Sequence, residues 1–259
     1  MNETMTTAIQ TPVFEMRGLA VASIKNPNVN VVDGINWTVN AGEFWVVGAP
    51  QHSGKSDFLM AAGGITSPAG GEFSFLGEAM PIFEESRMEH RLKLGFVFDG
   101  GQLLGSLSVA ENIALPLRYH SKMSGVEIEG RVNELLELTE LTPWANSTPV
   151  NVARSWRQRA GLARALALSP EVLLLDSPLT GLDVRHAAWW LGFLGELARG
   201  HRIVGGKSMT MVATADDLRP WRRRANRVAC LSGKQFLVLG DWATVDGSKE
   251  TVVQGLLQD

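Results

Sequence analysis

The sequence contains one cysteine, Cys230, among 259 residues. A single thiol excludes a disulfide framework and offers no cysteine cluster for a metal. Long apolar runs are also absent, since no stretch approaches the ~18 residues that span a bilayer. The polar residues 1–10 lack the apolar segment of a signal peptide. We therefore expect a protein of a reducing, cytosolic compartment, which lies at the inner face of a membrane only through a partner.

Neither sign of charge dominates, because the chain has 24 Lys and Arg residues, 27 Asp and Glu residues and a formal net charge of −3. This balance gives no electrostatic reason to expect a nucleic-acid partner. Hydrophobic residues make up 45% of the chain, which is enough for a sizeable core. We expect one domain over residues 11–259, preceded by a polar extension at 1–10.

Strand and helix patterns alternate along the chain, which predicts an α/β fold with a mostly parallel sheet. Residues 172–175 form a continuous apolar run, as in a strand that is buried on both faces. A mostly helical insert over about residues 100–168 predicts a second lobe. Strands are predicted within 14–47, including 29–39 and 43–47, and at 72–76, 94–98, 172–175, 209–214 and 227–231. Helices are predicted at 55–62, 126–138, 184–198 and 246–258.

A phosphate-binding loop is predicted between a strand and a helix, with alanine in place of the first glycine of the usual pattern. Its backbone N–H groups and the start of the helix would bind phosphate. Lys55 would reach the β- and γ-phosphates of a nucleotide, and the Ser56 hydroxyl would bind Mg²⁺. The loop consists of Ala49, Pro50, Gln51, His52, Ser53, Gly54, Lys55 and Ser56.

Two residues of this region depart from the usual pattern. His52 stands where glycine is common, so a positive φ at this position would be strained. Asp57 stands where a hydroxyl residue is common. Its carboxylate would either repel a nucleotide phosphate and occupy the positive helix end itself, or serve as an ordinary helix-start carboxylate; the sequence leaves both readings open.

Taken together, the motifs resemble those of ABC-transporter ATPases over nearly the whole chain, from about residue 14 onward. The resemblance implies a phosphate-loop NTPase cassette with a mostly parallel core sheet, an antiparallel β subdomain and a helical lobe. The matching segments are 94–99 at the Q-loop, 108–117 at the start of the helical lobe, 158–167 after the signature motif, 172–178 at Walker B and 180–183 at the D-loop.

Several positions depart from the family's catalytic pattern. Asp99 replaces the Q-loop glutamine, although a carboxylate can still bind a hard cation such as Mg²⁺. Ser177 replaces the catalytic glutamate, and a neutral hydroxyl is a poor base. Ala215 replaces the switch histidine and has no donor, while residues 22–24 offer no aromatic side chain for stacking on adenine. The resemblance therefore predicts bound ATP and Mg²⁺ with impaired hydrolysis.

The signature motif aligns with residues 152–156, where the family brings a hydroxyl and glycine N–H groups to the γ-phosphate of the facing subunit. Ala153 lacks the hydroxyl, and two bulky side chains stand where close backbone approach is needed. Arg154 could donate to phosphate or be an ordinary solvated or interface arginine. The predicted dimer-interface residues are Ala153, Arg154, Ser155, Trp156 and Asp183. The predicted metal ligands are Ser56, Asp176 and Asp99.

The resemblance implies two partners, a membrane permease and a second ABC subunit. We expect a coupling subunit of a transporter; residues 112–120 and 252–257 are most similar to the branch that moves phospholipids with MCE-type proteins. The alternative is a pseudo-ATPase that serves as a scaffold or regulator. A homodimer would lack every replaced group in both sites, whereas an intact partner would supply one glutamate and one histidine.

Overall fold

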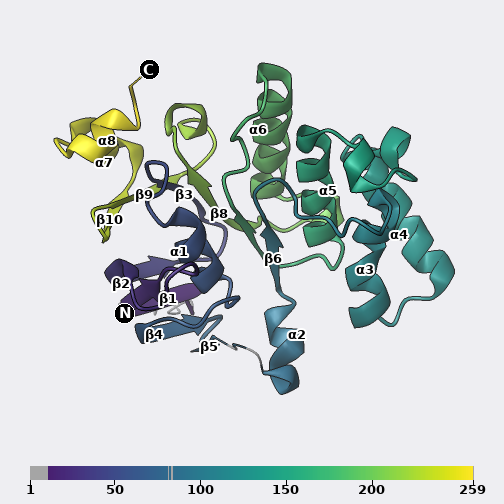
Figure 1. Ribbon diagram of the computed structural model, residues 1–259, viewed down its shortest axis with the longest axis horizontal. Coiled ribbons are helices and arrows are strands. Elements are labelled where there is room, and N and C mark those ends of the chain that lie inside the picture. Colours follow the sequence, from purple (N-terminus) through teal and green to yellow (C-terminus); the bar gives the residue numbers. More distant parts are fainter. Residues whose placement is uncertain (1–10, 81, 83, 259) are drawn as a thin grey trace, which may run out of the picture.

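Two β-sheets and a group of helices build the computed structural model, which describes residues 11–80, 82 and 84–258 (Figure 1). The predicted polar extension at 1–10 lies outside the described residues. The strands are β1 Phe14–Ala22, β2 Asn30–Val39, β3 Phe44–Gly48, β4 Gly70–Phe75, β5 Glu78–Ala79, β6 Leu94–Val97, β7 Val172–Leu175, β8 Thr210–Ala215, β9 Arg227–Ser232 and β10 Gln235–Gly240.

Eight α-helices and five short 3₁₀ turns lie between and after the strands of the described residues. The α-helices are α1 Lys55–Ala62, α2 Met88–Arg91, α3 Val109–His120, α4 Gly125–Leu138, α5 Arg154–Leu166, α6 Val184–Arg199, α7 Trp242–Gly247 and α8 Thr251–Gly255. The 3₁₀ turns are Glu85–Arg87, Thr142–Trp144, Pro149–Asn151, Arg202–Val204 and Arg219–Trp221.

The larger sheet has the order β10-β9-β3-β8-β7-β6, and the smaller sheet has the order β2-β1-β4-β5. Strands β9, β3, β8, β7 and β6 pair in parallel, while β10 and the whole smaller sheet pair antiparallel. Because the carboxyl ends of parallel strands meet at one edge, the segments after β3, β7, β8 and β6 come together there. The predicted phosphate loop follows β3 and therefore lies at this edge.

Strand β7 explains the continuous apolar run in its sequence. Leu173 and Leu175 belong to a core cluster with α5 and α6, whereas Val172 and Leu174 belong to a second cluster with α1 and the smaller sheet. Successive side chains of a strand point to opposite faces, so both faces of β7 are covered. The predicted strand at 172–175 and the predicted helix at 55–62 match β7 and α1.

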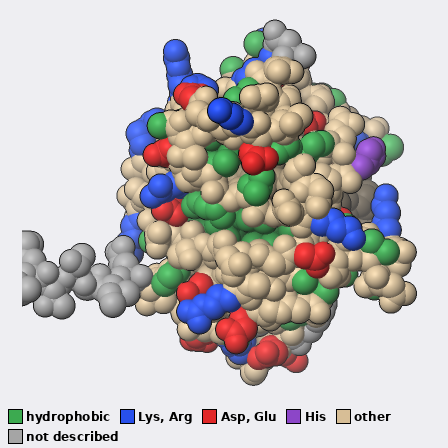
Figure 2. Space-filling model, turned by 90° about the vertical axis from the view of Figure 1, so that its left-hand side faces the viewer, with side chains coloured by type: hydrophobic (Ala, Val, Ile, Leu, Met, Phe, Trp, Pro, Cys, Tyr) green, Lys and Arg blue, Asp and Glu red, His purple; other side chains and the backbone are tan. Residues whose placement is uncertain are grey.

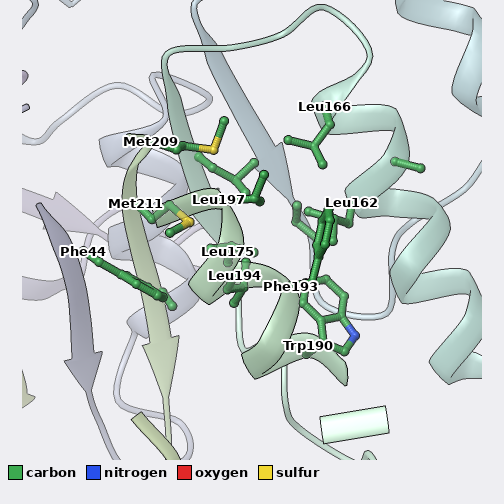
Figure 3. Close-up of a cluster of buried hydrophobic side chains, with 14 of the residues drawn as sticks. Phe44, Leu162, Leu166, Leu175, Trp190, Phe193, Leu194, Leu197, Met209 and Met211 are labelled. Atoms are coloured by element: carbon green, nitrogen blue, oxygen red, sulfur yellow. The ribbon is translucent and has the colours of Figure 1, made fainter. Parts of the chain in front are cut away.

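Helix α6 covers one face of the larger sheet through its aromatic and leucine side chains. Trp190 and Leu194 are fully buried, and they lie with Leu162 of α5 and Leu175 of β7 in the cluster of Figure 3. Burying a side chain of this size contributes about 1.5–3 kcal/mol relative to leaving it exposed. The cluster therefore stabilises the junction of sheet, α5 and α6.

Helices α3, α4 and α5 lie together on one side of the molecule (Figure 1). Two of them begin with a capping box, in which Ser108 and Glu111, or Ser124 and Glu127, satisfy each other's backbone N–H groups. Each of these caps stabilises a helix start by about 1 kcal/mol. The helical lobe predicted over about residues 100–168 therefore contains separate helices, and two of them have capped starts.

Two details at the C-terminal end differ from the expectations. The predicted helix at 246–258 is wrong, because α7 and α8 are separate short helices and Ser248 between them is extended. Asp241 caps α7 earlier than expected, with its carboxylate accepting from the Thr244 N–H at 2.9 Å. Strand β10 was not predicted; the turn before it contains Gly233 and Lys234, which both have positive φ, as tight hairpins require.

Within the part of the chain that the structure describes, no helix has both the length and the apolar character needed to cross a bilayer. Figure 2 views the molecule from the left-hand side of Figure 1. On this face hydrophobic side chains gather near the middle, and charged side chains of both signs lie around them.

The close approach of α5 to the loop after β6 generates the first prediction. Gly101 has a φ of +81°, and a Cβ placed on it would lie 2.1 Å from the Arg157 carbonyl oxygen. We expect Gly101→Ala to lower the free energy of unfolding by more than about 2 kcal/mol, because it adds both backbone strain and a backbone clash. Urea denaturation measures the change.

Gly105→Ala is the matched control, because it lies four residues further on and a Cβ there meets nothing within 4 Å. Its effect should stay within about 0.5 kcal/mol, as for other open surface positions. Equal losses in the two variants would contradict a close contact at Gly101.

Candidate nucleotide-binding site

The predicted phosphate loop forms one wall of a pocket of about 480 Å³. Gly54 caps α1 with a φ of 86°, and a Cβ on it would lie 2.7 Å from the Val31 Cβ. Glycine is therefore required here by both conformation and space. The first backbone N–H groups of α1 have no partner within the helix, and this makes the loop suitable for an anion. The pocket is lined by Ser23, Ile24, Lys25, Val31, His52, Ser53, Gly54, Lys55, Ser56, Asp57 and Met60.

Two residues of the loop, His52 and Ser53, have features expected of a phosphate-binding site. His52 has a φ of 60°, which is the condition under which the sequence predicts strain at this residue; such strain costs on the order of 1 kcal/mol. The Ser53 hydroxyl oxygen is buried and has no hydrogen-bond partner. A buried polar atom without a partner is costly, so this hydroxyl is available to a phosphate or another polar group of a ligand. The backbone N–H of Ala49 donates to the Ala215 carbonyl at 2.8 Å, which joins the loop to the end of β8.

The side chain of Asp57 points to a part of the chain far away in sequence. Its Oδ1 accepts a hydrogen bond from the Ile24 backbone N–H at 2.8 Å. Ile24 belongs to the segment after β1, where the predicted adenine-stacking aromatic is missing. Neither reading of Asp57 from the sequence included this bond, because it depends on how β1 and α1 are placed.

A second group of polar side chains lies at the ends of β7 and β8. Asp176 is only 5% exposed, and its Oδ1 accepts from the Thr214 hydroxyl at 3.0 Å and from the Ser177 hydroxyl at 3.3 Å. The Ser177 backbone N–H donates to the Thr214 hydroxyl oxygen at 2.9 Å. Thr214 was not predicted as a site residue; its position beside Ala215 at the end of a buried strand is the signal that could have found it.

Burial raises the pKa of the Asp176 carboxyl above its ordinary value. Hydrogen bonds from Ser56, Thr214 and Ser177 act in the opposite direction, and the nearby charge of Asp99 raises the pKa further. Two of the predicted metal ligands, Ser56 and Asp99, therefore both act on the third, Asp176. A divalent cation would offset the cost of this buried negative charge.

Asp99 has a partner within the same chain, since its carboxylate forms an ion pair with the Arg154 guanidinium. Arg154 is the first residue of α5, and its side chain lies close to Gly100 and Gly181, where a Cβ would lie 2.8 Å and 3.8 Å from it. The Q-loop, signature and D-loop positions therefore meet at this one side chain. Both side chains of the pair are nearly half exposed, so it contributes about 1 kcal/mol or less.

The other predicted interface residues surround the starts of α5 and α6. Ala153 precedes α5 and provides no side-chain cap, while Asp183 caps α6 by accepting from the Arg185 and His186 N–H groups at 2.9 Å each. The Trp156 ring lies 4.5 Å from the Arg159 guanidinium, so it packs within its own chain. Ser155 is half-buried on the same turn of α5.

Comparison with known proteins agrees with this geometry. Residues 32–180, more than half of the chain, match the family model described as ABC transporter. The chain belongs to the ABC transporter ATP-binding family. Among its solved neighbours is a dimeric ATP-binding cassette in a post-hydrolysis state bound to ADP and phosphate, which is 27% identical with a TM-score of 0.76 and overlaps over 86% of this chain and 95% of that one. The predicted cassette fold is thus confirmed.

Several curated ABC proteins are also similar to this chain in sequence. The methionine import ATP-binding protein MetN of Lacticaseibacillus paracasei is 31% identical over 84% of this chain, and the match spans only 60% of that protein. The lipoprotein-releasing system ATP-binding protein LolD 1 of Rhodopseudomonas palustris is 31% identical over 73% of this chain and 82% of that protein. The chain thus spans about three fifths of the length of the methionine-import relatives.

The ABC family implies ATP with Mg²⁺, and the residues present fit both groups. The buried Ser53 hydroxyl without a partner and the open helix start suit phosphate, while Ser56 and Asp176 provide the oxygen donors that Mg²⁺ prefers. When bound, the metal neutralises charge on the β- and γ-phosphates. Lys55, the first residue of α1, would hold the same phosphates from the protein side.

The raised pKa of Asp176 generates a prediction about this ABC site. The folded protein holds the Asp176 proton more tightly than the unfolded chain, so this group's contribution to the free energy of unfolding falls as pH rises above the ordinary aspartate range. We expect Asp176→Asn to be more stable than the wild type at pH 7 and to lose this advantage near pH 4. Urea denaturation at both pH values measures it.

Asp241→Asn is the control with the opposite sign. The pKa of Asp241 is lowered, chiefly by the hydrogen bond from the Thr244 backbone N–H, so its contribution is present at neutral pH and is lost on acidification. If Asp176→Asn showed the same pH trend as Asp241→Asn, the assignment of a disfavoured buried charge to Asp176 would be wrong.

Proposed function

We propose that this chain is an ATP-binding subunit of an ABC transporter that binds MgATP, hydrolyses it poorly in its own site, and docks on a membrane permease. The observation that supports this most directly is the Asp176 group. Residues suited to phosphate and Mg²⁺ surround it, while the side chain at the proposed water-activating position is the Ser177 hydroxyl, which is hydrogen-bonded to Asp176. Such a site is suited to hold a nucleotide rather than to activate water.

The size of the expected defect follows from the missing groups. Losing a general base costs about 10²–10⁴-fold in rate. Losing a donor that stabilises charge, here at Ala215, costs a further ~10²–10³-fold. The two losses together leave the site of this chain with negligible hydrolysis, so turnover in an assembly would depend on a partner subunit with its own glutamate and histidine.

A hollow between β6 and the helical lobe supports docking on a permease. This docking groove has a volume of about 480 Å³, and aromatic and leucine side chains line much of it. Tyr119 and Leu104 are 76% and 49% exposed at this place, and exposed apolar side chains around a hollow are typical of a protein contact. Its lining includes Leu94, Phe96, Phe98, Gln102, Leu104, Leu115, Pro116, Tyr119, His120 and Arg164.

The cargo is a finer proposal. Residues 112–120 and 252–257 favour a lipid-transport system, and one relative is named for lipoprotein release, while others are named for methionine import and pyoverdine export. Because ABC ATP-binding subunits work as dimers on a permease, we also propose that this chain pairs with a second ABC subunit at the inner face of a membrane. The second candidate, a pseudo-ATPase scaffold, is favoured by the ion pair between Asp99 and Arg154, because it occupies two positions that normally act on nucleotide.

Nucleotide binding separates these two candidates. We expect the purified chain to bind a fluorescent ATP analogue at micromolar concentration in the presence of Mg²⁺, and Lys55→Ala to weaken binding at least tenfold because a direct phosphate contact is lost. Phosphate release should stay at background. Absence of binding up to millimolar nucleotide would favour the scaffold, whereas Lys55-dependent hydrolysis at a normal rate would refute the impaired site.

The docking groove gives a second test, in cells that produce the chain together with its membrane partner. We expect Leu104→Asp to lower the fraction that sediments with membranes at least fivefold, because a charge in an apolar contact is costly. Val126→Asp on α4 is the matched control, since Val126 is 80% exposed and does not line the groove. Equal sedimentation of the two variants would refute docking at this place.

A further inference from the structure

The segment after β1 forms the wall of the nucleotide pocket that faces the phosphate loop. Ser23, Ile24 and Lys25 line the pocket together with Met60 of α1. The backbone of this segment is bent and leaves β1, and the Ser23 N–H donates to the Val29 carbonyl at 2.8 Å. This bond closes the segment between Ser23 and Val29, but it does not hold Ile24, the residue next to Ser23, against the phosphate loop.

Asp57 provides a contact with Ile24. Its carboxylate lies in the first turn of α1, directly after the phosphate-binding residues, and accepts the Ile24 N–H at 2.8 Å. The bond joins positions 33 residues apart in sequence. Asp57 thus fixes the distance between the phosphate loop and the opposite wall.

The residues that line the pocket explain why the position of Ile24 matters for a bound nucleoside. Among the described residues that line the pocket, none is a phenylalanine, tyrosine or tryptophan. Ile24 is 45% exposed, and Val31 and Met60 line the same space, so the apolar contacts of a nucleoside would come from aliphatic side chains. Such contacts are weak and depend on close approach, and they require Ile24 to be held in position.

We propose that Asp57 is a positioning residue for the nucleoside part of a bound nucleoside triphosphate, and that it acts through the Ile24 backbone rather than by touching phosphate. The proposal rests on the proposed function, because it concerns the same nucleotide pocket. It differs from a repelling role of the Asp57 charge, which would weaken the binding of every polyphosphate, with or without a nucleoside.

Two ligands and two variants separate these roles. Asp57→Ala removes the acceptor and the charge, whereas Asp57→Asn removes the charge and keeps an acceptor of the same shape. We expect Asp57→Ala to weaken MgATP binding about fivefold, the worth of one hydrogen bond, and to leave the affinity for Mg-tripolyphosphate within twofold of the wild type. Asp57→Asn should bind both ligands like the wild type.

The opposite pattern overturns the proposal: if both variants bind both ligands more tightly than the wild type, Asp57 acts by charge repulsion. Asp57→Ala that binds ATP like the wild type overturns the positioning role and leaves the proposed function intact. A wild-type chain that binds neither ligand overturns the proposed function itself. Isothermal titration calorimetry of the full chain measures all of these affinities.

Hydrogen exchange tests the contact without nucleotide. In the free protein, the amide protons of a peptide covering residues 22–26 should exchange about fivefold faster in Asp57→Ala than in the wild type, because Ile24 loses its acceptor. Asp57→Asn should retain the protection. Unchanged exchange in Asp57→Ala would show that other contacts hold the segment, and would overturn the proposal whatever the nucleotide affinity.

Discussion

The contact of α5 with the loop after β6 is the constraint on which the rest of the site depends. A Cβ at Gly161 would lie 2.7 Å from the Gly101 Cα, so the two backbones touch directly. The Arg164 guanidinium donates to the Gly101 and Gln102 carbonyls, and the Gln158 amide donates to the Pro178 carbonyl at 2.9 Å. Helical lobe, Q-loop and Walker B region are held together by one helix, which also forms part of the docking groove.

Three residues that are predicted to depart from the family pattern form hydrogen bonds or an ion pair within the chain. Asp99 pairs with Arg154, Ser177 donates to Asp176, and Asp57 accepts from Ile24. The bond to the buried Asp176 satisfies a polar group that would be costly to leave without a partner, whereas the half-exposed Asp99 and Arg154 gain little from their ion pair. These three residues therefore contact their own chain, while the first backbone N–H groups of α1 stay available for an anion.

Local signals were enough for parts of this structure. Strand β7 and helix α1 were predicted within their bounds, because an apolar run marks the strand and Gly54 before Lys55 marks the start of the helix. The helix at 246–258 failed because its pattern spans Ser248, where the backbone turns extended. The contacts at Asp99 and Asp57 could not be predicted, since they join residues 55 and 33 positions apart and depend on which strands and helices lie side by side.

The ion pair between Asp99 and Arg154 is weak, and this matters for the proposed dimer. Arg154 begins α5, where a positive charge is disfavoured by the helix dipole, and the Asp99 carboxylate offsets this cost. With both side chains nearly half exposed, the pair contributes about 1 kcal/mol or less. If the chain dimerises as proposed, a phosphate of the facing subunit would form bidentate bonds with Arg154 that are stronger than this ion pair. The pair therefore holds Arg154 beside Asp99 in the single chain, and the proposed dimer would have to replace this weak contact with a stronger one before Arg154 could act on nucleotide.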